Sequence, residues 1–297
     1  MLTTISKLSL AIKEDSSSVR DTLPSLQTDV AAIRDKQNLQ LDAQKIQRHN
    51  EIMEWLSPTD FPAQQHDIIT RRQEGTGQWF LDRAEFKRWL QGPDKTLFCP
   101  GIPGAGKTIM AAIAIDHLCK LAGNDGIGVT YLFCSYKAQA DQTVPSLLAA
   151  LLKQLVQNRL DIAPVVTQMY DEYSNRKSRP SMDEIIRALQ SVCSKYSAVY
   201  IVVDALDECA SKTRNQLIDK VCELQARMDV RLLFTSRYIP EIRQKFQCNP
   251  TLEVRASEED VGRYIQSRIN DLPSCIQCDK DLQGIVRSEI IEAVDGM

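Results

Sequence analysis

The feature that most constrains the fold is an apolar run that breaks into a glycine-rich turn and resumes as a helical pattern. In "LFCPGIPGAGKTIM", residues 97–110, the turn from Gly101 to Thr108 fits the pattern G-x-x-x-x-G-K-[ST]. Glycines let backbone N–H groups turn inward around an anion, and the start of the following helix directs its N–H groups and positive dipole end at the same point. The sequence therefore predicts a phosphate-binding loop between a strand and a helix. Lys107 is expected to reach the β- and γ-phosphates, and the Thr108 hydroxyl to bind Mg²⁺.

A second motif supplies carboxylates. The stretch "VYIVVDALDEC", residues 199–209, is a buried strand that ends in acids. Asp204 at its tip is the expected Walker B aspartate, which holds Mg²⁺ directly or through water. Asp207 and Glu208 follow one turn on, and a carboxylate there can polarise a water that faces the γ-phosphate. We prefer Glu208 for this role, whereas Asp207 has the alternative of capping the next helix.

A third apolar run also ends in polar residues. The run "VRLLFTSRY", residues 230–238, reads as a buried strand that ends in Thr235, Ser236 and Arg237. In folds built around a phosphate-binding loop, an extra strand can lie between the strand before the loop and the Walker B strand. The tip of this extra strand is then directed at the γ-phosphate. Ser236 and Arg237 are therefore candidate sensors of that phosphate. The alternative is that Arg237 pairs with a surface carboxylate.

Strand and helix patterns alternate through the middle of the chain. Apolar runs occur at 96–99, 129–135, 198–204, 230–235 and 252–255, and helical patterns lie at 107–121, 145–158, 182–194 and 212–227. This alternation predicts an α/β fold, a three-layer core whose parallel sheet is covered on both faces. The runs are apolar at consecutive positions, as strands buried on both sides are.

Four regions follow from these patterns. Residues 1–56 are expected to be helical, with a kink or a new helix at Pro24; most of this region is polar, which favours a solvated bundle or stalk helix over a coiled coil. Residues 57–94 read as a proline-marked linker and an amphipathic helix that ends at Gly92-Pro93. Residues 95–256 form the predicted core, and residues 257–297 a helical segment.

Composition excludes several classes of protein. The apolar fraction of 43% and charged fraction of 25% are those of an ordinary globular protein. The net charge is −3 without a block rich in Lys and Arg, so no nucleic-acid partner is expected. No stretch approaches the roughly 18 uninterrupted apolar residues of a membrane span, and the first residues lack the pattern of a signal peptide. Nine scattered cysteines indicate reduced, buried thiols and a cytoplasmic location; the ones in apolar segments are Cys99, Cys119, Cys134, Cys193 and Cys222.

With these motifs in hand, the chain resembles a NACHT-type NTPase of the STAND class, the signalling relatives of AAA+ ATPases. In particular it resembles the fungal NOD-like receptor group, whose NACHT module is similar to the N-terminal part of nephrocystin-3. The stretches that carry the resemblance are "RRQEGTGQWFLDRAEFKRWLQGPDKTLFCPGIPGAGKT", "VYIVVDALDEC", "RLLFTSR" and "LEVRASEEDVGRYIQSRI". It covers about residues 51–297, and residues 1–50 match only loosely, as the tail of a helical N-terminal domain.

The resemblance implies a set of site residues. The phosphate contacts it implies are Gly104, Ala105, Gly106, Lys107, Thr108 and Ile109, with Gly101 and Pro103 completing the loop. In the roles that the resemblance implies, Asp204 binds Mg²⁺ and Glu208 or Asp207 polarises the attacking water. Arg237 senses the γ-phosphate. The segment from Gly75 to Gln78 is the implied contact for the base or ribose. ATP or ADP with Mg²⁺ is the implied ligand, because the family mostly uses adenine nucleotides and no guanine-reading N-K-x-D motif is present.

Three functions compete for this site. The first is a signalling switch, in which nucleotide exchange and slow hydrolysis control homo-oligomerisation and the N-terminal helices bind protein partners. The second is a P-loop kinase, for which the stretch "YSNRKSRPS", residues 173–181, offers a basic lid; Pro180 and Ser181 favour a polar loop that leads into the next helix instead. The third is a scaffold stabilised by nucleotide without turnover. Glu208 favours hydrolysis and hence the switch.

Three further features carry less weight. Relatives continue into a winged-helix element and repeats, so a chain that stops at "VDGM" is expected to be a fragment or a truncated product with an incomplete helical lid. Cys275-x-x-Cys278 can be redox-active or half of a zinc site, but no second cysteine pair or histidine cluster accompanies it, which favours an incidental role. Trp79 and Trp89 lie in a helical pattern that favours packing over ligand stacking.

Overall fold

The computed structural model describes residues 34–157, 159, 164–176, 178–271 and 274–295. By internal contacts the chain divides into residues 1–54 and residues 55–297. Residues 34–56 are helical, as predicted for this part of the chain, while the kink predicted at Pro24 lies outside the described residues. No helix of the described residues combines the length and apolar character needed to cross a membrane.

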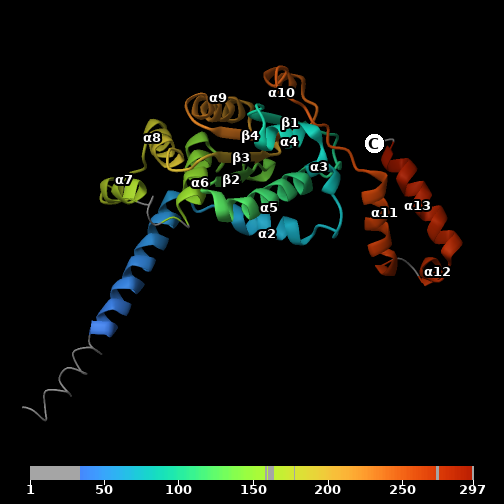
Figure 1. Ribbon diagram of the computed structural model, residues 1–297, viewed down its shortest axis with the longest axis horizontal. Coiled ribbons are helices and arrows are strands. Elements are labelled where there is room, and N and C mark those ends of the chain that lie inside the picture. Colours follow the sequence, from blue (N-terminus) through green and yellow to red (C-terminus); the bar gives the residue numbers. More distant parts are fainter. Residues whose placement is uncertain (1–33, 158, 160–163, 177, 272–273, 296–297) are drawn as a thin grey trace, which may run out of the picture. The chain divides into compact units, whose positions relative to one another are not determined.

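The core is a parallel sheet (Figure 1). Within the described residues its strands are β1 (Thr96–Pro100), β2 (Gly128–Phe133), β3 (Val199–Asp204) and β4 (Val230–Ser236), in the spatial order β1-β4-β3-β2. Almost every position in them is buried, because helices cover both faces. The strand β4 lies between β1 and β3, which confirms the predicted extra strand. Because these strands are parallel, their carboxyl ends lie at the same edge of the sheet. The parallel sheet with helices on both faces confirms the predicted α/β class.

The fifth predicted strand is only partly formed. Residues 252–255 do not make a strand in the structure, but Thr251 forms an isolated parallel bridge with Phe98. The Leu252 N–H donates to the Phe98 carbonyl at 2.9 Å, and the Val254 N–H to the Pro100 carbonyl at 2.7 Å. This extended segment therefore lies beside β1, on the side away from β4. A Cβ on Gly101 would lie 2.6 Å from the Val254 carbonyl, so the start of the glycine-rich loop requires glycine for close packing.

Helices lie on both sides of the sheet (Figure 1). The helix α5 (Lys107–Asp125) lies on one side, together with α2 (Phe61–Thr70), and α9 (Ser211–Arg227) lies on the other. The remaining core helices are α6 (Val144–Val156), α7 (Pro164–Ser174), α8 (Met182–Cys193) and α10 (Pro240–Lys245). Ser181 and Glu184 form a capping box at the start of α8, which confirms the predicted loop leading into this helix. The helix α7 was not predicted from the sequence.

The helix α2 corrects the prediction of a linker after residue 57. Asp60 caps it by accepting a hydrogen bond from the Ala63 N–H at 2.9 Å. Pro62 lies in the first turn, where its missing N–H costs nothing. Gln65, which is buried, donates to the Ala112 carbonyl at 2.8 Å and ties α2 to α5. The two prolines flank the start of a helix, so they do not mark a linker here.

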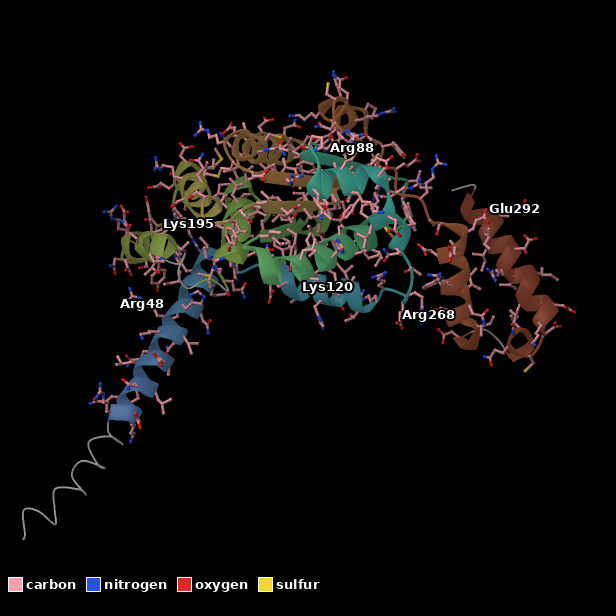
Figure 2. All side chains as sticks on the ribbon, viewed as in Figure 1. Arg48, Arg88, Lys120, Lys195, Arg268 and Glu292 are labelled. Carbon is pink, nitrogen blue, oxygen red and sulfur yellow. The ribbon has the colours of Figure 1, made fainter. Side chains whose placement is uncertain are left out.

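The amphipathic pattern before the glycine-rich loop forms two helices. These are α3 (Gln78–Asp82) and α4 (Ala84–Gln91), separated by Arg83 in an extended conformation. The predicted stop at Gly92 is confirmed, since Gly92 follows the last residue of α4. Phe80, Phe86 and Trp89 have no exposed surface, which supports a packing role for Trp89. Arg88 lies on the exposed side of α4, as Lys120 does on α5 (Figure 2).

The cysteine prediction holds only in part. Cys99, Cys134 and Cys193 are buried as expected, whereas Cys119 is exposed and Cys222 is partly exposed. Both lie on helices with a solvent-facing side, so their apolar sequence surroundings did not determine their burial. The described cysteines are free thiols.

The C-terminal region is helical, as predicted. It comprises α11 (Glu258–Ser267), α12 (Ser274–Gln277) and α13 (Lys280–Asp295). Short 3₁₀ turns are η1 (Tyr136–Ala138), η2 (Leu206–Glu208) and η3 (Ile269–Asp271). Ser257 caps α11 by accepting the Asp260 N–H at 3.1 Å, and three acids in its first turn face the positive end of the helix dipole.

Candidate functional site

The glycine-rich loop joins β1 to α5. Gly104 and Gly106 adopt φ angles of +82° and +85°, a conformation that residues with a side chain rarely take. A Cβ on either residue would meet no atom within 4 Å, so the space over the loop is open. Pro103 is exposed, Ala105 is buried beneath the loop and Ile109 is partly buried in α5. Gly106 is the N-cap of α5, which brings the N–H groups of the first turn to this space.

Lys107 folds back onto the loop. Its ammonium donates to the carbonyls of Gly101 at 3.0 Å and Ile102 at 2.7 Å. Burial lowers the pKa of Lys107 from its ordinary value, while the carboxylates of Asp207 and Asp204 act in the opposite direction. The carbonyl partners are neutral, so a phosphate can replace them with a stronger, charge-assisted interaction.

Asp204 ends β3 as a buried carboxylate that is 2% exposed. Its Oδ2 accepts the Thr108 hydroxyl at 2.8 Å, and its Oδ1 accepts the Thr235 hydroxyl at 2.5 Å. Burial raises the pKa of Asp204, and the two hydroxyl hydrogen bonds oppose that rise. Among the described residues no cationic side chain lies within ion-pair distance of it. A buried carboxylate is stabilised by a cation, and hydroxyl and carboxylate oxygens are ligands of the kind that Mg²⁺ prefers, so Asp204 and Thr108 fit this metal.

Thr235 makes a contact with Asp204 that was not predicted from the sequence. Its hydroxyl donates to Asp204 and accepts the Ala205 N–H at 2.9 Å. Among the described residues, Ala205 is the only non-glycine with positive φ, at +56°. The Ser236 hydroxyl is buried and donates instead to the Arg237 carbonyl at 2.9 Å. The signal in the sequence was that Thr235 also ends the apolar run of β4, beside the strand that ends in Asp204.

Asp207 and Arg237 form a pair at the same edge of the sheet. The Arg237 N–H donates to Asp207 Oδ1 at 3.0 Å, and the Arg237 Nε lies 3.1 Å from Asp207 Oδ2. The Asp207 side chain is 6% exposed and that of Arg237 is 54% exposed. Arg237 therefore pairs with a carboxylate of the site and not of the outer surface. Asp207 does not cap α9, whose N-cap is Ala210.

Glu208 has different partners. Its Oε2 accepts the Tyr136 N–H at 3.0 Å, and its backbone carbonyl accepts from the Gln139 side chain at 2.7 Å. Both partners lie just after β2, so the end of β2 holds Glu208 in place. As whole residues, Glu208 and Asp207 are both half-buried, and the Asp207 side chain is 6% exposed.

The segment from Gly75 to Gln78 lies against α11. Asp260 Oδ2 accepts two hydrogen bonds, from the Gly77 N–H at 2.9 Å and from the Trp79 Nε1–H at 3.0 Å. Gly77 has a φ of +75°, and a Cβ there would lie 2.3 Å from Ile113 Cδ1 on α5. The segment is thus wedged between α5 and α11, and Asp260 joins it to the C-terminal helices.

Replacing Asp260 with alanine is expected to loosen this connection. Two donors lose a charged acceptor, and hydrogen bonds to charged groups contribute roughly 1.5–3 kcal/mol each. Amide hydrogen exchange at residues 75–79 should therefore accelerate roughly tenfold or more. The control is Glu258→Ala, which removes an exposed acid from the same turn of α11. Equal exchange rates in the two variants would show that Asp260 does not hold the segment.

Other candidates lie apart from this edge. A cavity of about 360 Å³ is lined by residues such as Trp55, Pro145 and Arg179, and no residue of the glycine-rich loop borders it. Cys278 is exposed, while the side chain of Cys275 lies outside the described residues. The described part of the chain contains no cluster of three or more metal-ligating side chains.

Two sequence comparisons identify relatives. The family model described as "Nephrocystin 3, N-terminal" matches residues 75–237, more than half of the 297-residue chain. The vegetative incompatibility protein HET-E-1 of Podospora anserina is 23% identical over 236 residues. The match covers 73% of this chain and 17% of that protein, so the chain matches a small part of its relative.

Two solved structures share part of their backbone with this chain. The Walker-type ATPase PABY2304 of Pyrococcus abyssi has a TM-score of 0.45 and 13% identity, over 77% of this chain and 66% of that one. The Drosophila ORC bound to DNA has a TM-score of 0.43 and 14% identity, over 69% of this chain and 50% of that one. The assignment of the fold rests on the strand order and the family match.

Proposed function

Because the chain belongs to the family of nephrocystin 3 N-terminal domains, which bears out its resemblance to NACHT-type NTPases, we propose that it is a nucleotide-dependent signalling switch. Residues 95–256 bind ATP or ADP with Mg²⁺ and hydrolyse ATP slowly. The observation that carries the proposal is the contact of the buried Asp204 with Thr108 of the glycine-rich loop and with Thr235 of β4. These two hydrogen bonds link the ends of β3 and β4 to the glycine-rich loop that follows β1.

The loop supplies the phosphate site. Backbone N–H groups of the loop and of the first turn of α5 are proposed to bind the phosphates in the open space over Gly104 and Gly106, where the N-terminus of α5 adds its dipole; the Ala105 N–H donates to the Ile102 carbonyl in this structure. Lys107 exchanges the carbonyls of Gly101 and Ile102 for phosphate oxygens. Burial lowers the pKa of Lys107 and so disfavours its protonated form. The negative charge of a bound phosphate acts in the opposite direction and stabilises the protonated form.

Thr108 and Asp204 are the residues that would hold Mg²⁺. When bound, the metal neutralises charge on the phosphates. The chain's own part is to orient the Asp204 carboxylate and to oppose the rise in its pKa that burial causes; the hydroxyls of Thr108 and Thr235 do both by donating to its two oxygens. Thr235 in turn accepts the Ala205 N–H, so the tip of β3 is held in its unusual backbone conformation.

Glu208 is the residue proposed to accept a proton from the attacking water. The Tyr136 N–H donates to one of its oxygens, whereas both oxygens of Asp207 are engaged by Arg237. Arg237 is proposed to read the γ-phosphate. A phosphate that attracts the guanidinium competes with Asp207, so the Asp207–Arg237 pair is an element that nucleotide can make or break.

The partners and the setting of the switch are also proposals. HET-E-1 is named a vegetative incompatibility protein, and we place this chain in a fungal NOD-like immune or incompatibility pathway, in the cytoplasm. Homo-oligomers form in the activated state, and the N-terminal helices contact protein partners. Residues 57–94 form the segment that precedes the core, and residues 257–297 form the start of a helical lid.

A scaffold that binds nucleotide without turnover is the second candidate. It is favoured by the hydrogen bonds within the chain that hold Lys107, Thr108 and Asp204. A small-molecule kinase is less well supported, since Ser181 at the end of the candidate lid is the N-cap of α8. Neither alternative assigns a role to Glu208.

The proposal is tested by identifying the nucleotide that co-purifies with the protein. The purified protein is denatured, and the released nucleotide is separated by ion-pair chromatography and quantified against protein. We expect ADP or ATP at close to one equivalent, retained in the presence of Mg²⁺ and released by EDTA. A guanine nucleotide would contradict the proposed specificity. A protein that is empty and also fails to bind added Mg-ATP would contradict the proposed function.

A further inference from the structure

The cavity of about 360 Å³ takes no part in the candidate nucleotide site. Its volume lies within the range of pockets that hold small molecules, and its described lining belongs wholly to residues 55–297. Three parts of the fold form its wall: residues 55–58, the first half of α6, and the loop before α8 together with the start of that helix. This cavity is therefore a second place on the chain where a ligand can bind.

Much of the cavity wall is apolar. Three of its apolar residues, Leu56, Ala149 and Ile185, are buried, while Pro58 and Pro145 are exposed. An apolar ligand body gains free energy when it leaves water for a surface of this kind. The wall therefore favours an occupant with an apolar body.

Trp55 gives the cavity a fixed aromatic surface. Its ring meets the ring of Tyr170 edge-on, with the ring centres 5.3 Å apart. The guanidinium carbon of Arg179 lies 5.6 Å from the centre of the Trp55 ring, and Arg179 Nη1 donates to the Trp55 carbonyl. Trp55 and Arg179 also line a second cavity, of about 300 Å³. The two side chains are thus held against each other where both cavities are lined.

Arg179 gives this region a positive charge. It is the one charged residue among the described residues that line either cavity. A guanidinium has five N–H donors, and within the described part of the chain Arg179 donates only to the Trp55 carbonyl and pairs with no carboxylate. Arg176, three residues earlier, pairs instead with Glu172 at 3.6 Å. A guanidinium with unused donors beside an apolar cavity is suited to a carboxylate, sulfonate or phosphate group.

A second unused donor lies in the cavity wall. Ser57 is 2% exposed, and its Oγ accepts the Thr59 N–H at 3.3 Å. Within the described residues its hydroxyl donates to no acceptor, although most buried polar groups are hydrogen-bonded. The Ser57 carbonyl accepts from Lys153 Nζ of α6 at 2.7 Å, which fixes this residue in place. The Ser57 hydroxyl is therefore free to donate to a ligand oxygen.

The start of α6 adds to the positive potential. Thr143 and Pro145 line the cavity at the N-terminus of this helix, and its first turn contains no acidic residue. The positive end of the α6 dipole therefore favours an anion nearby. At the start of α8, by contrast, Asp183 and Glu184 offset the dipole of that helix.

We propose that this cavity binds a small organic anion with an aromatic body, such as an aryl carboxylate. Its acid group lies on Arg179, and its body lies against Trp55 and the apolar wall. A cavity of this volume suits a small molecule, whereas a stable protein partner covers about 800 Å² on each side. No residue of the glycine-rich loop lines the cavity, so the anion and a nucleotide can be bound at the same time.

The test uses the full chain and two fluorescent probes. One is 8-anilinonaphthalene-1-sulfonate, and the other is N-phenyl-1-naphthylamine, which has the same aromatic rings without the sulfonate. Both fluoresce more strongly in apolar surroundings, so titration gives their affinities. We expect one equivalent of the sulfonate to bind per chain, to stay bound when Mg-ATP is added, and to bind more weakly as salt is raised. The affinity for the neutral probe should not depend on salt.

Variants place the probe in the cavity. Arg179→Gln should lower the affinity for the sulfonate roughly tenfold and change that for the neutral probe less than twofold. The matched control is Arg176→Gln, which removes the same charge from an exposed side chain outside the cavity lining and should leave both affinities unchanged. Ala149→Leu fills the cavity and should lower both affinities roughly tenfold. Thermal unfolding of each variant shows that it is folded.

Two outcomes would overturn the proposal. A sulfonate affinity that is unchanged in both Arg179→Gln and Ala149→Leu would mean that the probe binds elsewhere on the chain. Equal salt dependence for the two probes, together with equal losses in Arg179→Gln, would show an apolar cavity that does not recognise an anion.

Discussion

Lys107→Ala is expected to weaken the binding of Mg-ATP by about 100-fold, which corresponds to roughly 3 kcal/mol. The reason is that Lys107 is the cation of the glycine-rich loop, and its carbonyl partners Gly101 and Ile102 can be exchanged for phosphate oxygens. The dissociation constant is measured by isothermal titration calorimetry at fixed ionic strength, because phosphate binding weakens with salt.

The matched control for this variant is Lys120→Ala. Lys120 lies on the same helix, α5, at the surface (Figure 2), and its side chain is 74% exposed and paired with Asp116. Its replacement changes the net charge equally and should change the affinity less than twofold, since exposed pairs contribute about 0–1 kcal/mol. If Lys107→Ala binds Mg-ATP as tightly as Lys120→Ala does, the loop is not the nucleotide site.

Glu208→Gln is expected to reduce phosphate release by roughly 100-fold or more while leaving the affinity for Mg-ATP nearly unchanged. The amide keeps the size of the side chain and can still accept the Tyr136 N–H, but it does not take a proton from water. The measurement is the rate of phosphate release in a single turnover, with affinity determined on the same preparation.

Two comparisons make this result specific. Glu223→Gln changes an exposed glutamate on α9, paired only with Lys220 in the described structure, and should not alter the rate. Asp207→Asn removes a charge that pairs with Arg237, so it is expected to alter the response to the γ-phosphate more than the chemical step. If Asp207→Asn abolishes phosphate release and Glu208→Gln does not, the roles of the two acids are reversed.

The sequence predicted the parts of the fold that repeat a simple pattern. Strands buried on both faces appear as consecutive apolar residues, so β1 to β4 were predicted within about one or two residues of their ends. The helix α2 was missed because prolines were interpreted as breaks, although Pro62 lies in the first turn, where proline is well tolerated. The segment at 252–255 was predicted as a strand because a hydrophobic pattern does not reveal how many hydrogen bonds a strand makes; the structure gives hydrogen bonds from Leu252 and Val254 to β1.

The candidate site was predictable where one motif carries several groups. Lys107, Thr108 and Asp204 could be located because the glycine-rich loop and the Walker B strand fix their neighbours in sequence. Thr235 could not, since its contact with Asp204 depends on β4 lying next to β3. The same holds for Asp260 and Trp79, which are far apart in sequence.

The most direct test of the central claim is single-turnover hydrolysis by the wild-type chain with ATP labelled on the γ-phosphate and protein in excess. The claim predicts slow release of inorganic phosphate that requires Mg²⁺, stops with EDTA, and leaves ADP bound. Intact ATP that stays bound through many hours with Mg²⁺ present would contradict a hydrolytic switch and identify a nucleotide-stabilised scaffold. Loss of ATP only on addition of a small-molecule acceptor would contradict it in favour of a kinase.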